Sequence, residues 1–133
     1  PQPIDLAVPG RTELPGGCAL VIALYPREAA GSLQQAGRYE AWVDVDACGR
    51  PLQLRHRRPG DRFQPLGMTE LKKLQDFLVD EKVPQVERGR LPLVVSPRGI
   101  VWVVGYRLDG RFRVRPETRW VYHLQWLQVA GAG

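Results

Sequence analysis

Residues 91–104 read LPLVVSPRGIVWVV, and the fold class can be worked out from this stretch outward. Two short apolar runs, 91–95 and 100–104, flank Ser-Pro-Arg-Gly, which is typical of a turn. Apolar runs of this length that are bounded by turn signals favour strands over helices. The stretch therefore predicts a β-hairpin.

The same texture continues on both sides of the hairpin. Residues 19–25 form another short apolar run, and residues 39–46 and 120–126 alternate between apolar and polar side chains. Alternation of this kind is typical of half-exposed strands, and it would place Asp44 and Asp46 on a solvated strand face. Shorter strand signals occur at 4–8 and 52–55. Together these patterns predict a mostly β domain of the α+β class.

Residues 69–81 show the one clear helical pattern. Thr69 is suited to cap the N-terminus, and Pro84 indicates that the helix ends by Val83. The apolar side chains fall on one face at helical spacing; they are Leu71, Leu74, Phe77 and Leu78. We therefore expect one main helix over about residues 69–81, with Phe77 in the core.

Lys72 and Lys73 lie near the predicted start of this helix. Cations at that end oppose the helix dipole, at a cost of ~0.3–1 kcal/mol. Free N–H groups together with two lysines are nevertheless suited to hold a phosphate. The sequence therefore predicts an anion-binding helix start.

Charge is spread unevenly along the chain. Residues 1–54 carry 4 Lys or Arg and 6 Asp or Glu, whereas residues 55–133 carry 15 and 8. The sequence pI is about 9.7. A basic segment of this kind indicates a polyanionic partner such as a nucleic acid. The competing interpretation is that scattered arginines solvate a β-rich surface, and the charge count alone favours neither.

The densest positive charge surrounds residues 57–67, where two Pro and two Gly predict a long loop. Arginine binds phosphate through its planar fork and lysine binds it as a point charge. The residues expected to contact phosphate are Arg55, Arg57, Arg58, Arg62, Lys72, Lys73 and Arg88. For Arg62 and Arg88 an internal ion pair, with Asp61 and Asp76 respectively, is an equal alternative. Asp61 itself is expected to be a turn acceptor or an ion-pair partner.

A third arginine-rich segment lies near the C-terminus. Arg111, Arg113 and Arg115 alternate with Phe112 and Val114. If the backbone is extended there, all three arginines face the same side.

No pattern in the sequence predicts a catalytic site. A P-loop and a Gly-x-Ser-x-Gly nucleophile turn are both missing. Cys18, Cys48, His56 and His123 are too scattered for a zinc site, so the two thiols are expected to be buried or half-buried in a reducing compartment. We therefore expect neither a metal nor a cofactor in this chain.

Several motifs occur in a specific order and spacing. They are RHRRPGDRF at 55–63, PLGM at 65–68, KKLQDF at 72–77, LPLV at 91–94 and IVWVVG at 100–105. In this combination the sequence resembles the C-terminal domain of bacterial tRNA(Ile)-lysidine synthetase. The resemblance is close over about residues 52–106 and general elsewhere.

The resemblance implies a β-sandwich-like domain of unusual topology that binds isoleucine tRNA, notably toward the acceptor stem. It implies that residues 52–133 are the substrate-binding domain and that residues 1–51 are a β-rich part packed on it. The parent enzymes are cytoplasmic ligases that use ATP and Mg to attach lysine to the wobble cytidine. Their ATP site lies in an N-terminal PP-loop domain whose Ser-Gly-Gly-x-Asp-Ser motif is absent from this sequence.

Two other interpretations stay open. The domain can be an interaction or homodimerisation module of the same enzyme that makes no RNA contact. Exposure of Trp102, Trp120 or Trp126 would favour this interpretation, because aromatic side chains anchor protein interfaces. The weaker alternative is a domain of a synthetase β-subunit, which shares the fold type.

Overall fold

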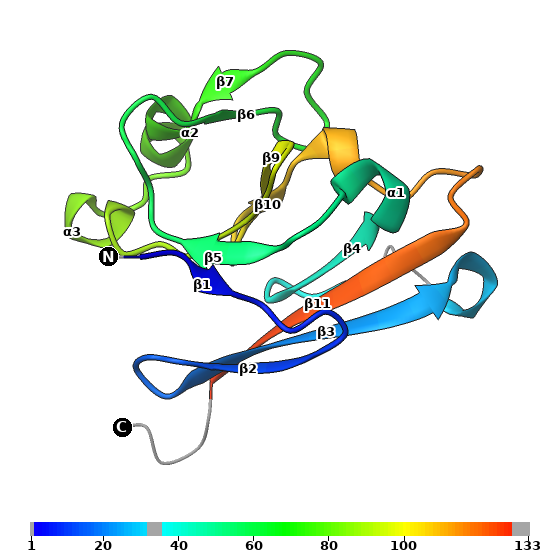
Figure 1. The fold of residues 1–133 in the computed structure, drawn as a ribbon. Helices are drawn as coiled ribbons and strands as arrows, with labels where there is room; N and C mark the ends of the chain where they lie inside the picture. The colour runs from blue at the N-terminus through cyan, green and yellow to red at the C-terminus, as the bar shows by residue number, and fades with distance from the viewer. Residues whose placement is uncertain (1, 32–35, 129–133) are drawn as a thin grey trace.

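The computed structural model describes residues 2–31 and 36–128. Two antiparallel sheets that face each other form the framework of the fold (Figure 1). The first sheet has the strand order β2-β3-β11-β4, in which the long strands β3 and β11 pair along their whole length. Its strands are β2 (Gly10–Leu14), β3 (Cys18–Pro26), β4 (Glu40–Asp44) and β11 (Trp120–Gln128).

The second sheet has the strand order β1-β5-β8-β9-β10. Its strands are β1 (Ile4–Asp5), β5 (Gln53–Arg55), β8 (Leu93–Ser96), β9 (Gly99–Val103) and β10 (Arg107–Leu108). The predicted hairpin is confirmed, since β8 and β9 pair across the turn. Strands from both sides of position 51 share the sheets, because β11 lies between β3 and β4, and β5 pairs with β1. The division of the chain between residues 51 and 52 stays a prediction.

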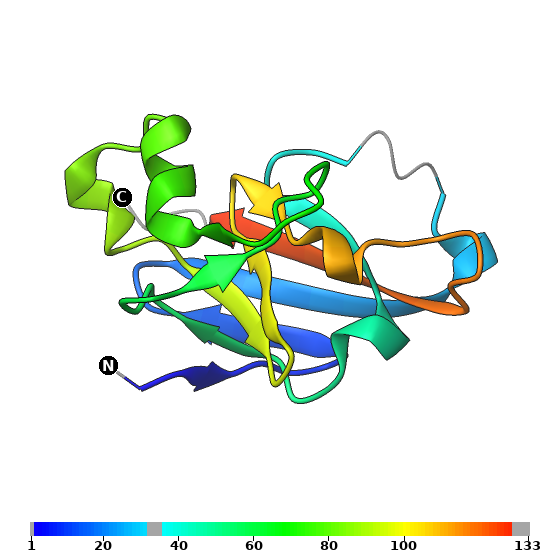
Figure 2. The same cartoon turned by 90° about the horizontal axis from the view of Figure 1, so that it is seen from above.

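The remaining elements are short. A small ladder joins β6 (Arg62–Phe63) to β7 (Lys72–Lys73). The helices are α1 (Val45–Cys48), α2 (Leu74–Asp80) and α3 (Gln85–Arg88), and 3-10 turns occur at η1 (Arg27–Ala29) and η3 (Gly110–Phe112). Helices α2 and α3 lie at one end of the molecule and α1 lies at the other (Figures 1 and 2).

Two hydrophobic clusters hold these layers together. The first lies between the sheets, where Leu20 and Leu124 share a cluster with Val94 of β8. The second covers the other face of the five-stranded sheet and contains Phe63 and Phe77, whose rings meet edge to face at 5.0 Å. Because side chains alternate along a strand, β8 sends Val94 to the first cluster and its two neighbours to the second. The predicted α+β, mostly β class is confirmed.

The main helix is shorter than the sequence predicts. It begins at Leu74 because Lys72 and Lys73 pair with β6, and that pairing uses backbone groups that a longer helix would need. Lys73, and not Thr69, is the N-cap residue, and its side chain makes no capping hydrogen bond. Leu71 is 51% exposed and stays outside the core. The prediction that both lysines open the helix is therefore wrong.

Two further expectations need correction. The strand predicted at 39–46 ends at Asp44, whose carboxylate accepts hydrogen bonds from the N–H groups of Asp46 (2.9 Å) and Ala47 (3.3 Å) and so caps α1. Asp44 is therefore both the last residue of β4 and the N-cap of α1, and Asp46 lies in the helix instead of on a strand face. The loop predicted at 57–67 contains the strand β6, which is limited to two residues by the proline-containing turns on either side.

Candidate nucleic-acid interface

Strand β5 ends at Arg55, and the arginine loop, residues 56–61, folds back against this residue. Arg55 and Asp61 form a two-pronged ion pair, with Nη1–Oδ2 at 2.9 Å and Nη2–Oδ1 at 3.0 Å. Only 15% and 13% of the two side chains is exposed. Asp61 also accepts a hydrogen bond from the backbone N–H of Arg58 at 2.8 Å, and its own carbonyl accepts one from Leu74. These contacts fix the arginine loop against the start of α2.

The Asp61 carboxyl group titrates at lower pH than an ordinary aspartic acid. Burial by itself raises its pKa, but hydrogen bonds from Arg55 and Arg58 and the charges of both guanidinium groups outweigh this effect. The pKa of Asp61 therefore lies below 3.8. The expectation that Asp61 is a structural acceptor is confirmed, and its partner is Arg55 instead of Arg62.

Strands β6 and β7 bring Arg62 and Lys73 together as directly opposed partners. Within residues 2–31 and 36–128, neither side chain forms an ion pair or a hydrogen bond to another side chain. The neighbouring Lys72 pairs with Asp80 of α2. Like charges that oppose each other in a ladder cost stability, so folding does not account for the Arg62–Lys73 pair.

Arg57, Arg58 and Lys73 line a small hollow of about 60 Å³ beside the turn at 59–60. Asp61 also lines this hollow, but in the described part of the chain the side chains of Arg57 and Arg58 form no ion pair. Since Lys73 also opposes Arg62, the four cations are continuous. We call Arg57, Arg58, Arg62 and Lys73 the basic surface.

Arg88 lies in α3, at the same end of the molecule as the arginine loop and α2 (Figure 1). Its Nε donates a hydrogen bond to the carbonyl of Val83 at 2.9 Å, and the side chain is half-buried. Asp76 is not its partner, so the alternative of an Arg88–Asp76 pair is wrong. Of the seven predicted contacts, six converge on the arginine loop and the β6–β7 ladder, and Arg88 lies beside them.

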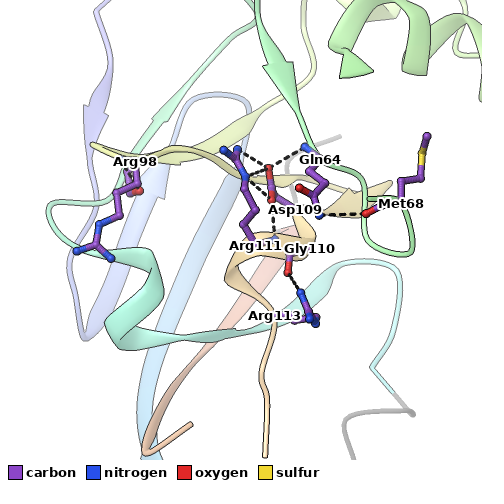
Figure 3. Close-up of polar contacts among 8 residues, drawn as sticks. Gln64, Met68, Arg98, Asp109, Gly110, Arg111 and Arg113 are labelled. Atoms are coloured by element: carbon purple, nitrogen blue, oxygen red, sulfur yellow. Dashed lines mark hydrogen bonds and ion pairs between the residues drawn. The ribbon is translucent and has the colours of Figure 1, made fainter. Parts of the chain in front are cut away.

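A second set of buried polar contacts, which we call the Asp109 clamp, is not evident from the sequence. Asp109 is fully buried and accepts hydrogen bonds from the backbone N–H groups of Gln64 (2.9 Å) and Arg111 (2.8 Å), and from Arg111 Nη2 at 2.7 Å (Figure 3). The N–H of Gly110 donates to the Gln64 carbonyl at 2.8 Å. The clamp ties the segment after β6 to the end of β10. The only sequence signal for it is the Asp-Gly pair at 109–110, which is typical of a turn.

This clamp overturns the expectation that Arg111, Arg113 and Arg115 face one side. A 3-10 turn replaces the extended backbone, Arg111 pairs with Asp109, and Arg113 donates to the Gly110 carbonyl at 2.6 Å (Figure 3). Arg98 is structural too, since its Nη1 donates to two carbonyls of α1 at 2.7 and 2.8 Å. The cations of residues 55–133 thus fall into two groups: arginines with hydrogen bonds or ion pairs that stabilise the fold, and cations without such contacts in the described chain.

No group of three or more His, Cys, Asp or Glu in residues 2–31 and 36–128 is placed to hold a metal ion. Cys48 is buried and Cys18 is half-buried, as predicted. Burial raises the pKa of the Cys48 thiol to about 12, although the charge of Arg98 acts in the opposite direction. Within the same residues, no helix is long and apolar enough to cross a membrane.

Comparison with known proteins places the chain in a family. Residues 52–126 match the family described as "TilS substrate C-terminal domain". This chain belongs to that family. A relative from Symbiobacterium thermophilum, named tRNA(Ile)-lysidine synthase, is 45% identical over 115 residues, which cover 86% of this chain and 23% of the relative. A relative of the same name from Caldanaerobacter subterraneus is 45% identical over 82 residues, or 62% of this chain and 18% of the relative.

The chain therefore spans less than a quarter of the length of these relatives. Among solved structures it is similar to one described as the crystal structure of a TILS C-terminal domain, with a TM-score of 0.76, 31% identity and 98% coverage of both chains. An N-terminal fragment of the phenylalanyl-tRNA synthetase β-subunit from Pyrococcus horikoshii gives a TM-score of 0.53 at 16% identity, over 85% of this chain and 30% of that one. At that identity the likeness is one of fold alone.

Proposed function

We propose that this family member is the tRNA-binding C-terminal domain of a tRNA(Ile)-lysidine synthase. The parent enzyme is a cytoplasmic ligase that attaches lysine to the wobble cytidine of isoleucine tRNA with ATP. ATP and Mg bind to its N-terminal PP-loop domain, outside this chain. This domain holds the tRNA toward its acceptor stem and supplies no catalytic group.

The observation that carries the proposal is the basic surface. Arg57, Arg58, Arg62 and Lys73 have no acidic partners in the described chain, and the Arg55–Asp61 pair fixes the loop that presents two of them. Proteins recognise RNA duplexes mainly through the backbone and the 2′-hydroxyl groups, so fixed cations on a rigid surface suffice. Release of counterions from the phosphates supplies much of the affinity.

The other predicted contacts take graded roles in this proposal. Arg55 positions the arginine loop, because both of its terminal nitrogens are bonded to Asp61. The ion pair between Lys72 and Asp80 lies at the surface, where such a pair contributes ~0–1 kcal/mol and exchanges readily for a phosphate. The Nε of Arg88 donates to the Val83 carbonyl, and within residues 2–31 and 36–128 its other guanidinium nitrogens make no hydrogen bond and can donate to a phosphate.

The test is binding of the chain to an acceptor-stem minihelix of isoleucine tRNA over a series of salt concentrations. The triple variant Arg58→Glu, Arg62→Glu, Lys73→Glu is expected to reduce the slope of log K against log salt by roughly three, about one per cation removed. The matched control reverses three exposed arginines outside the basic surface: Arg11, Arg50 and Arg119. Both triple variants lose the same net charge. Equal losses of affinity in the two would contradict a specific surface.

A second candidate function, homodimerisation, is favoured by one observation. Trp120 is 47% exposed and opposes Pro26 in the first sheet, next to the partly exposed Tyr25. Trp102, by contrast, is 2% exposed and belongs to the core. Sedimentation of the chain at increasing concentration tests this candidate. The RNA proposal would be replaced if the chain forms a dimer that Trp120→Ser dissociates and if the chain does not bind the minihelix.

A further inference from the structure

A cavity of about 510 Å³ opens beside the arginine loop, between ends of the two sheets. Its buried and half-buried lining is largely apolar and includes Ile4, Leu14, Leu54, Pro92 and Trp126. Its exposed lining includes the cations Arg58 and Arg90. A volume of this size is typical of sites that take small molecules.

Among the described residues, no acidic side chain lines this cavity, so the positive charge of its arginines is not neutralised within it. Arg57, Arg58 and Arg90 have no ion pair within residues 2–31 and 36–128, whereas Arg55 is bonded to Asp61. An apolar interior that contains one large aromatic side chain, under a cationic rim, complements a planar ring that carries a phosphate. A base-paired duplex offers phosphates but no free ring, and an apolar peptide offers no anion for the arginines.

We propose that this cavity takes one unpaired nucleotide of the bound RNA, with its base on Trp126 and its phosphate on Arg57, Arg58 and Arg90. This inference rests on the proposed function to the extent that the ligand is RNA. Unpaired bases are commonly stacked on aromatic side chains and bound at their phosphates by arginine. The chain would therefore recognise a junction between a duplex and an unpaired nucleotide, and not a duplex alone.

The cavity is continuous with the basic surface. Arg57 and Arg58 line the cavity, and the same two arginines line the small hollow that reaches Lys73. One RNA strand can thus contact Lys73 and Arg62 through its paired phosphates and then enter the cavity where pairing ends. The Arg55–Asp61 ion pair joins the two ends of the arginine loop, so it holds Arg57 and Arg58, which both sites share, in one geometry.

The test compares a blunt RNA hairpin with the same hairpin carrying one unpaired 3′ nucleotide, 2-aminopurine. The wild-type chain is expected to bind the second RNA about fivefold or more tightly, and stacking should quench the 2-aminopurine fluorescence. Trp126→Leu should remove the preference and the quenching and leave blunt-hairpin affinity within about twofold. The control is Trp120→Leu, the same substitution on the same strand outside the cavity, and it should change neither RNA affinity.

Trp126 packs on the first hydrophobic cluster, so its replacement can also disturb folding. Arg90→Ala provides a second variant, because Arg90 is exposed at the rim. It should reduce the preference for the unpaired nucleotide about threefold without changing the unfolding midpoint. Equal binding of both hairpins by the wild-type chain would overturn the proposal.

A third ligand separates this inference from the proposed function. A 5′-phosphorylated single-stranded trinucleotide should quench the fluorescence of Trp126, seen as the difference between the wild-type chain and Trp126→Leu. If the trinucleotide binds in this way and the blunt hairpin does not, the cavity is confirmed and duplex binding fails. If the hairpin binds and the trinucleotide leaves Trp126 unchanged, the cavity assignment is wrong and the proposed function stands. A Trp126 response to an acidic, apolar peptide alone would also overturn the assignment, in favour of a protein ligand.

Discussion

Asp61 holds the arginine loop from within, and its ionisation links the shape of the loop to pH. Its pKa is lowered in the folded chain, so the folded state favours the ionised carboxylate. This stabilisation is complete above the unfolded pKa of about 3.9 and is lost as the pH falls through that value toward the folded pKa.

Replacing Asp61 tests this link. Asp61→Asn leaves the half-buried Arg55 without its charged partner, so the free energy of unfolding at pH 7 should fall by about 1–3 kcal/mol. The variant should also lose less stability than the wild-type chain between pH 5 and pH 3. Urea unfolding at a series of pH values measures both effects. Parallel losses in the two proteins would show that Asp61 is not the group responsible.

Asp109 is the more deeply buried acid and anchors a larger network. Asp109→Ala would leave the Arg111 guanidinium and two backbone N–H groups without their acceptor. The free energy of unfolding is expected to fall by about 3 kcal/mol or more. Asp46→Ala is the control, since its ion pair with Arg119 is exposed and should contribute under ~1 kcal/mol. Chemical denaturation of both variants measures the difference, and similar losses would contradict the clamp.

For single residues, the sequence identifies the cations that could contact a polyanion, but not which of them form ion pairs within the fold. Asp61 is predictable as an acceptor because it follows Pro-Gly in a turn. The partner of Asp61 is not predictable, since Arg55 contacts Asp61 only because the arginine loop reverses the chain direction. The role of Asp109 is not predictable because one of its hydrogen-bond donors, the N–H of Gln64, is 45 positions away.

At the start of α2, the proposed RNA contact and the stability of the helix favour different residues. Lys73 is the N-cap residue of α2, although lysine there gives no capping hydrogen bond. Lys73→Ser should therefore stabilise the chain by ~0.5–1 kcal/mol through a new cap. The same change removes one cation of the basic surface, so the salt slope for minihelix binding should fall by about one. Thermal unfolding and RNA titration of the same variant measure the two effects.

Lys72→Ser serves as a comparison, because it removes a neighbouring lysine but cannot create an N-cap. A Lys73→Ser variant that gains no stability over Lys72→Ser would contradict the capping argument. Unchanged RNA binding by Lys73→Ser would remove Lys73 from the basic surface.

Elements whose pattern is local were predicted well. The β8–β9 hairpin and the strands β3 and β11 carry their periodicity within a few residues, so sequence suffices to find them. The helix start was misplaced because β7 forms only through pairing with β6, across an intervening turn. In the sequence, Thr69 as a cap candidate and the helical spacing of Leu71 and Leu74 favour an earlier helix start, and no local pattern indicates the pairing of β7 with β6.

For the whole molecule, the uneven charge overestimates how many arginines could contact a polyanion. Several arginines of the basic half hold the fold, among them Arg98, which bonds to α1, and Arg111, which pairs with Asp109. The family could be recognised from the sequence because its motifs run through one continuous segment, and residues 52–126 match it. The cavity beside Trp126 could not be predicted, because it is lined by residues from both sheets that are far apart in sequence.

The most direct test of tRNA binding by the basic surface is a map of backbone amide shifts while the acceptor-stem minihelix is added. If the basic surface binds the minihelix, the shifts cluster at residues 57–62 and 73–75, and Arg58→Glu with Lys73→Glu abolishes them. Shifts that gather instead around Trp120 and Tyr25, with residues 57–62 unchanged, would contradict the account.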